Sequence, residues 1–145
     1  VSRTFSKAYG LAGLRAGYLV ADASVVQRIE PIRESFNLNA FALAGAEAAL
    51  SDTAHLATVR DGNEIERTWL RNALSGLGFS VLPSQTNFLL VRFGERTADI
   101  EQGLLNRGIV VRPMSGYGLS EYLRVTVSNR LENQRLLLSL SEIVS

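Results

Sequence analysis

Residues Ser2–Tyr18 read S-R-T-F-S-K-A-Y-G-L-A-G-L-R-A-G-Y and carry the strongest signal in the chain. Lys7 lies among small hydroxyl residues, and Arg15 follows it in a turn punctuated by glycines. A lysine amine in such a place can form a Schiff base with an aldehyde cofactor. Thr4, Ser6 and Arg15 can hold a dianion, such as a phosphate group on that cofactor, through hydrogen bonds and charge. The stretch therefore predicts a lysine that carries a phosphorylated aldehyde.

Two other interpretations of this stretch are weaker. A single lysine is most often a solvated surface residue, so Lys7 without its neighbours would indicate nothing. A glycine-rich loop also occurs in nucleotide sites, but the pattern G-x-x-x-x-G-K-[ST] is absent and Gly10–Gly17 does not match G-x-G-x-x-G. Here the lysine precedes the glycines, which is the reverse of the order in a P-loop. A nucleotide site is therefore disfavoured.

The stretch resembles the lysine segment of the fold-type I pyridoxal-phosphate aminotransferases, in which S/T-x-S-K is followed by R-x-G. Within that superfamily it is most similar to the histidinol-phosphate aminotransferase branch. The resemblance implies that pyridoxal 5′-phosphate binds to Lys7 and that Thr4, Ser6 and Arg15 hold its phosphate. It also implies that the freed lysine acts as the general base and acid of a transamination.

The second half of the chain resembles the small domain of the same enzymes. The similar stretches are P-S-Q-T-N-F-L-L-V-R-F, G-I-V-V-R-P-M and Y-L-R-V-T-V-S-N-R-L-E-N-Q-R-L. The resemblance implies that Arg124 grips the anionic end of the substrate; the alternative is a solvated position on a strand edge. Arg112 is a second candidate for anion binding. Asn87 would either reach the substrate or fix a turn.

The pattern of apolar residues predicts an α/β chain. Expected strands cover residues 1–5, 15–21, 79–82, 87–93, 109–112 and 122–127. One helix is expected to begin at a cap formed by Asp22 or Ser24, and others are expected at about 40–51, 53–77 and 98–107. A final helix is expected to begin at Asn129, which with Glu132 resembles a capping box. The resemblance implies that residues 1–52 are the end of a large pyridoxal-phosphate-dependent transferase domain. Residues 53–145 would form a small C-terminal α+β domain with a long linking helix.

Composition argues against several classes of protein. The 145 residues are 46% hydrophobic and 20% charged with a net charge of +1, so we expect a packed core and no broad electrostatic binding of nucleic acid or an anionic membrane. There is no cysteine, and His55, the single histidine, cannot hold a metal alone, so no metal site is expected. Neither a signal peptide nor a long apolar run is present, which predicts a cytoplasmic protein.

The chain begins with Val1 and no methionine, a few residues before the expected catalytic lysine. We therefore expect the C-terminal portion of a larger enzyme, inactive as this piece alone. The intact enzyme would be a homodimer acting on a small amino donor and a 2-oxo acid, with histidinol phosphate and 2-oxoglutarate, in histidine biosynthesis, as the favoured pair. Aromatic amino acid aminotransferase and threonine-phosphate decarboxylase activities stay open within the family. A non-catalytic folded fragment is the alternative from another class.

Overall fold

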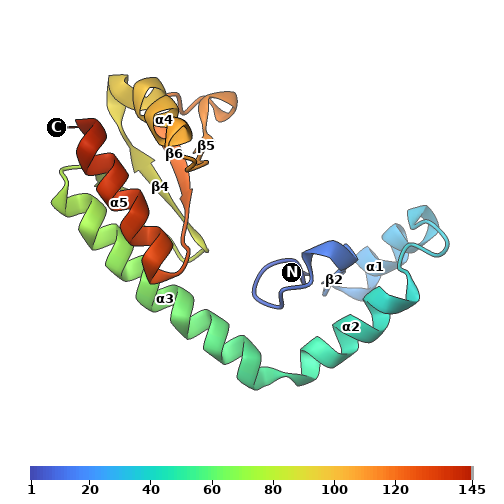
Figure 1. The fold of residues 1–145 in the computed structure, drawn as a ribbon. Coiled ribbons are helices and arrows are strands. Elements are labelled where there is room, and N and C mark those ends of the chain that lie inside the picture. Colours follow the sequence, from blue (N-terminus) through green and yellow to red (C-terminus); the bar gives the residue numbers. More distant parts are fainter. Residues whose placement is uncertain (145) are drawn as a thin grey trace. The chain divides into compact units, whose positions relative to one another are not determined.

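The computed structural model describes residues 1–144, and the chain divides into two compact units (Figure 1). The first unit is Val1–Arg60 and the second is Asp61–Ser145. The division falls within the helix α3, Thr53–Gly76, which begins in the first unit and ends in the second. The sequence-based division into domains after residue 52 stays a prediction.

The first unit is built on a two-stranded antiparallel hairpin followed by helices. In chain order its elements are β1 Ser2–Thr4, η1 Ala12–Leu14, β2 Gly17–Leu19, α1 Ala23–Ile29, η2 Glu30–Ile32 and α2 Ala40–Ser51. β1 pairs with β2 so that Arg3 lies opposite Tyr18. The expected strands at this end of the chain and the Ala-rich helix are therefore confirmed, and both strands are shorter than predicted.

Short polar side chains begin both helices of this unit. The N–H of Ser24 donates to Oδ1 of Asp22 at 2.9 Å at the start of α1. The N–H of Ala42 donates to Oδ1 of Asn39 at 2.8 Å at the start of α2. A side-chain oxygen at this position satisfies one of the free amide groups of the first turn. Asp22, rather than Ser24, is thus the cap of α1.

A small core joins the hairpin loop to α2. Its buried members are Phe5, Ala16 and Ala42. Phe5 is 3% exposed, and its ring centre lies 5.0 Å from that of Tyr9 and 5.7 Å from that of Tyr18. Because Phe5 is held by these contacts, the residues that follow it in the loop are fixed at the edge of this core.

The second unit is a four-stranded antiparallel sheet in the order β3-β4-β6-β5 (Figure 1). Besides the later part of α3, its elements are β3 Ser80–Val81, β4 Phe88–Arg92, η3 Gly94–Arg96, α4 Thr97–Asn106, β5 Arg112–Pro113, η4 Ser115–Tyr117, β6 Tyr122–Thr126 and α5 Arg130–Val144. In the described part of the chain, no helix has the length and apolar character needed to cross a membrane.

One face of this sheet forms the core of the second unit. The buried strand residues are Leu89, Val91, Leu123 and Val125, and the helices contribute Leu70, Leu74, Ile100, Leu104, Leu136 and Leu140. Successive side chains of a strand point to opposite faces of the sheet. Leu90 and Arg124, which are register partners on β4 and β6, therefore lie on the face away from the helices.

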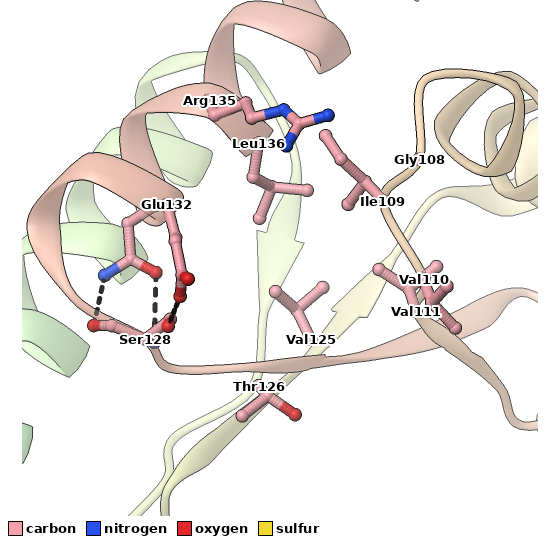
Figure 2. A pocket seen from close by; sticks show the side chains of 11 residues that line it. Gly108, Ile109, Val110, Val111, Val125, Thr126, Ser128, Glu132, Arg135 and Leu136 are labelled. Carbon is pink, nitrogen blue, oxygen red and sulfur yellow. Dashed lines mark hydrogen bonds between the residues drawn. The ribbon is translucent and has the colours of Figure 1, made fainter.

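The strand expected at residues 109–112 is mostly absent, because β5 contains only Arg112–Pro113. The chain leaves α4 through Gly108, which has φ 72°. The N–H of Ile109 then donates to the carbonyl of Leu104 at 2.9 Å and closes the end of the helix. Residues 109–111 line a cavity of about 300 Å³ beside β6 instead of pairing with it (Figure 2). The sequence Ile-Val-Val favours a strand, but the N–H of Ile109 donates to the end of α4 and is not available to pair with β6.

Of the two hydrogen bonds that define the predicted capping box, only one is formed at the start of α5. The N–H of Glu132 donates to Oδ1 of Asn129 at 3.0 Å, as expected of the cap. The Glu132 carboxylate, however, accepts a hydrogen bond from the hydroxyl of Ser128, one residue earlier than a capping box requires (Figure 2).

Candidate active site

The predicted lysine lies in the loop that joins β1 to β2. Backbone hydrogen bonds at both ends fix this loop: Phe5 N–H donates to Ala16 C=O at 3.1 Å, and Leu11 N–H donates to Phe5 C=O at 3.0 Å. Within it, Gly10 N–H donates to Lys7 C=O at 2.8 Å. Residues 7–10 therefore form a tight turn, and Gly10 supplies the positive φ of 72° at its end.

Lys7 presents its side chain to solvent at the start of this turn, two residues after the buried Phe5. It is also the only lysine among the 145 residues. This feature of the composition supports the assignment of Lys7 independently of the motif. Among the side chains of these 145 residues, only that of Lys7 carries a primary amine that can react with an aldehyde.

The three residues predicted to hold a phosphate group lie at the end of β1, which is Thr4, and in the loop that follows it. Ser6 N–H donates to Thr4 Oγ1 at 3.1 Å. Nη1 of Arg15 donates to Ser6 Oγ at 3.5 Å and to the carbonyl of Ala12 at 2.7 Å. Two hydroxyls and one guanidinium supply the donors and the positive charge that suit a phosphate dianion. The structure thus brings together the residues that the sequence selected, and their binding role stays a prediction.

The backbone of this loop is constrained where Arg15 enters it. Arg15 has φ 55°, in the left-handed region that non-glycine residues rarely adopt. Such conformations persist where surrounding structure imposes them, and they cluster at binding sites. Gly17 follows in β2, and a Cβ on it would lie 2.7 Å from the carbonyl oxygen of Arg3. The close approach of the two strands at Gly17 therefore ties the Thr4 end of the loop to the Arg15 end.

A second cluster of predicted site residues belongs to the second unit, on the sheet face away from its core. Arg112 of β5 and Arg124 of β6 are register partners. Side chains of such partners start about 5 Å apart, so two positive groups emerge side by side. Nε of Arg124 is buried and has no hydrogen-bond partner within the described residues. A buried donor without a partner is costly, and both observations favour an anionic ligand here.

Two aromatic rings support these arginines. Cζ of Arg124 lies 5.2 Å from the ring centre of Phe88. Cζ of Arg112 lies 5.8 Å from the ring centre of Tyr117, and its Nη2 donates to the Tyr117 hydroxyl at 3.3 Å. Sequence reasoning missed both rings. The alternation of β4 could have placed Phe88 on the face of Arg124, whereas Tyr117 lies in a loop without a repeating pattern.

Asn87 lies just before β4 and is exposed. Its backbone carbonyl accepts a hydrogen bond from Val127 N–H at 2.9 Å, which closes this end of the β4–β6 pair. Nη1 of Arg67, 9% exposed, donates to the preceding carbonyl of Thr86 at 3.1 Å. These contacts support the role of the segment as a fixed turn, and substrate contact by the Asn87 side chain stays a prediction.

Known proteins resemble the chain over nearly its whole length. A family model described as aminotransferase class I and II matches residues 1–140. Histidinol-phosphate aminotransferase 1 of Thiobacillus denitrificans is 48% identical over 145 residues, which cover 100% of this chain and 38% of that protein. Histidinol-phosphate aminotransferase of Anaeromyxobacter sp. is 46% identical, covering 99% of this chain and 40% of that protein. The chain therefore spans only 38% and 40% of the length of these curated relatives.

Solved structures share the fold. Histidinol-phosphate aminotransferase from Sinorhizobium meliloti, in complex with pyridoxal-5′-phosphate, superposes with a TM-score of 0.88 at 32% identity, covering 99% of this chain and 40% of that chain. L-threonine-O-3-phosphate decarboxylase from Porphyromonas gingivalis has a TM-score of 0.87 at 30% identity, covering 99% of this chain and 46% of that one. The mixed helices and sheets thus match those of pyridoxal-phosphate-dependent enzymes.

Proposed function

The chain belongs to the aminotransferase class I and II family, and from this premise we propose that it carries the lysine segment and the substrate arginines of a pyridoxal-phosphate-dependent enzyme. Its favoured reaction is the transfer of an amino group between histidinol phosphate and 2-oxoglutarate. The observation that carries the proposal is the position of Lys7 in one loop with Ser6 and Arg15, directly after Thr4 at the end of β1. The names of the relatives at 48% and 46% identity support the choice of substrate.

The donor set of this loop fits pyridoxal phosphate. The cofactor, when bound, supplies an electron sink that stabilises negative charge at the substrate carbon. Lys7 would bind the aldehyde through Nζ, as the chain's only lysine. Arg15 with the hydroxyls of Thr4 and Ser6 would hold the phosphate. Once freed, the Lys7 amine is the group in this loop that can remove and return a proton at the substrate carbon bearing the amino group.

The paired arginines would hold the anionic end of the substrate. A guanidinium binds either a carboxylate or a phosphate through two parallel hydrogen bonds. In the proposed reaction the amino donor histidinol phosphate carries a phosphate and the acceptor 2-oxoglutarate carries carboxylates. The same pair of arginines can therefore bind both substrates. The orphaned Nε of Arg124 and the facing position of Arg112 support this role.

A second candidate is decarboxylation of a phosphorylated amino acid. The decarboxylase from Porphyromonas gingivalis resembles the chain at 30% identity with a TM-score of 0.87, which favours this candidate over aromatic transamination. It would use the same lysine segment and the same arginines, because both substrates carry a phosphate.

Since the chain spans 38% and 40% of the length of its curated relatives, we propose that turnover requires the full-length protein. We propose that this protein acts as a homodimer.

The test is a substrate panel on the full-length protein saturated with pyridoxal phosphate. Histidinol phosphate with 2-oxoglutarate should yield glutamate, and Lys7→Ala should abolish the reaction. Release of carbon dioxide from threonine phosphate, with no glutamate formed from histidinol phosphate or threonine phosphate, would favour decarboxylation over transamination. If the folded, cofactor-loaded protein acts on no amino donor, the non-catalytic alternative is supported.

A further inference from the structure

The cationic face of the second unit is not neutralised by the protein itself. Arg92 lies on the same face and pairs with Glu121 at 2.6 Å. Within residues 1–144, by contrast, neither Arg112 nor Arg124 forms an ion pair with a carboxylate. Like charges placed directly opposite on neighbouring strands destabilise a sheet. The site is therefore arranged to accept negative charge from a ligand.

The two arginines are supported differently. Arg124 is half-buried and lies against the Phe88 ring, which provides no hydrogen-bond acceptor. Arg112 is exposed and is held by Tyr117 in two ways, through the ring and through the hydroxyl that accepts from Nη2 at 3.3 Å. An exposed arginine has considerable rotamer freedom, so the hydrogen bond to the Tyr117 hydroxyl lowers the entropy that Arg112 loses when it binds an anion. Of the two arginines, only Arg112 contacts Tyr117 within the described residues.

Carboxylate and phosphate make different demands on such a pair. A carboxylate has two oxygens and one negative charge, which a single guanidinium fork satisfies. A phosphate monoester near neutral pH has a charge of about −1.5 to −2 and three terminal oxygens, so it can engage a second guanidinium. Arg124, with its unsatisfied Nε, suits either anion, whereas Arg112 adds what only the phosphate needs.

We propose that Tyr117 is a positioning residue that holds Arg112 for a phosphate monoester and thereby sets the preference of this site for phosphorylated over purely carboxylic substrates. This inference rests on the proposed function for its substrates, and on the Arg112–Tyr117 contact for its mechanism. Tyr117 itself is 65% exposed, so its hydroxyl adds selectivity rather than stability of the fold.

The first test is steady-state kinetics on the full-length protein loaded with pyridoxal phosphate. Tyr117→Phe should raise KM for histidinol phosphate about three- to fivefold, which is the size of the typical net contribution of one intramolecular hydrogen bond. KM for glutamate in the reverse direction and kcat for both substrates should stay near the wild-type values. Tyr122→Phe, on the same face but beside Arg92, is the matched control and should change neither KM.

A double-variant comparison separates positioning from a general structural role. If Tyr117 acts through Arg112, Tyr117→Phe should have no further effect in an Arg112→Gln background. Equal increases in KM for both substrates, no increase for histidinol phosphate, or an undiminished effect in the Arg112→Gln background would each overturn the proposal.

A binding measurement keeps the inference independent of turnover. Calorimetric titration of the cofactor-saturated protein with methyl phosphate should show weaker binding for Tyr117→Phe than for the wild type, while acetate binding should be equal in the two. If no amino donor is turned over, the proposed function fails, and this titration still decides the role of Tyr117. Equal methyl phosphate affinity in the two proteins would overturn that role even if transamination is confirmed.

Discussion

Arg112 and Arg124 occupy facing positions on β5 and β6, so two positive side chains share one face of the sheet, and within residues 1–144 neither pairs with a carboxylate. A pair of this kind lowers the stability of a sheet, as like charges do on opposite strands. Binding of an anion by the two guanidinium groups would offset this cost. The arrangement predicts a trade between stability and function at these positions.

Arg112→Gln should therefore not destabilise the full-length protein, and the relief of repulsion should raise its unfolding free energy by up to about 0.5 kcal/mol. The same variant should lose affinity for phosphate. Urea unfolding with and without methyl phosphate measures both effects. Arg92→Gln is the control, because it removes a partner of Glu121 and should not gain stability. A clear loss of stability in Arg112→Gln would show that the residue is structural.

Gly17→Ala should disrupt the lysine loop. Its new Cβ would lie 2.7 Å from the Arg3 carbonyl oxygen, so the strands must separate, at a cost of about 1–3 kcal/mol in unfolding free energy. Because this contact fixes the two ends of the loop, cofactor affinity should also fall. Gly13→Ala in the same loop is the control, since a Cβ there meets nothing within 4 Å. Similar cofactor affinities for both variants would contradict the role of Gly17.

Glu66 should make stability depend on pH. The Arg130 guanidinium donates to its carboxylate at 3.1 Å and lowers the pKa of Glu66 below its usual 4.5, with a further hydrogen bond from Asn133 at 3.1 Å. A lowered pKa in the folded state contributes stability that is present above pH 4.5 and is lost as the pH falls through the lowered value.

Glu66→Gln should consequently destabilise the protein by about 1–2 kcal/mol at pH 7. The difference from the wild type should shrink as the pH falls below 4.5. Urea unfolding across this range measures the difference, with Glu64→Gln on the exposed surface of α3 as the control. A destabilisation that is unchanged at the acidic end would mean that the charge of Glu66 contributes nothing.

Leu123→Ala should strongly destabilise the second unit. Leu123 is the second residue of β6 and is completely buried, and truncation of such a residue leaves a cavity and costs about 3 kcal/mol. Leu138 on α5 is 67% exposed, so Leu138→Ala should cost less than about 0.5 kcal/mol. Chemical denaturation of both variants tests whether the core of this unit is as described.

Local sequence signals predicted much of this fold, and they failed where tertiary contacts decide. The helix at Ala40–Ser51 was predicted from residues close together in the chain. The strand expected at Ile109 was wrong because its N–H closes α4 at Leu104, a choice that periodicity cannot reveal. In the same way, Glu132 bonds to Ser128 because of the path of the chain entering α5.

In the candidate site too, the contacts within one stretch of sequence were predictable and the contacts between distant stretches were not. Lys7, Ser6 and Arg15 form a contiguous motif, so their proximity was predictable from sequence. The facing positions of Arg112 and Arg124 depend on strand register, and the contact of Arg112 with Tyr117 depends on the conformation of η4. These relationships join residues that no spacing rule connects, and they appear only in the structure.

Chemical trapping at Lys7 bears most directly on whether this chain carries a cofactor lysine. The full-length protein is incubated with pyridoxal phosphate, reduced with borohydride and digested, and the modified peptide is identified by mass spectrometry. We predict a reduced pyridoxyl group on Lys7, and none in Lys7→Arg or when Arg15→Gln is treated with limiting cofactor. A protein that binds the cofactor but carries the adduct on another residue, with Lys7 unmodified, would contradict the assignment of this loop.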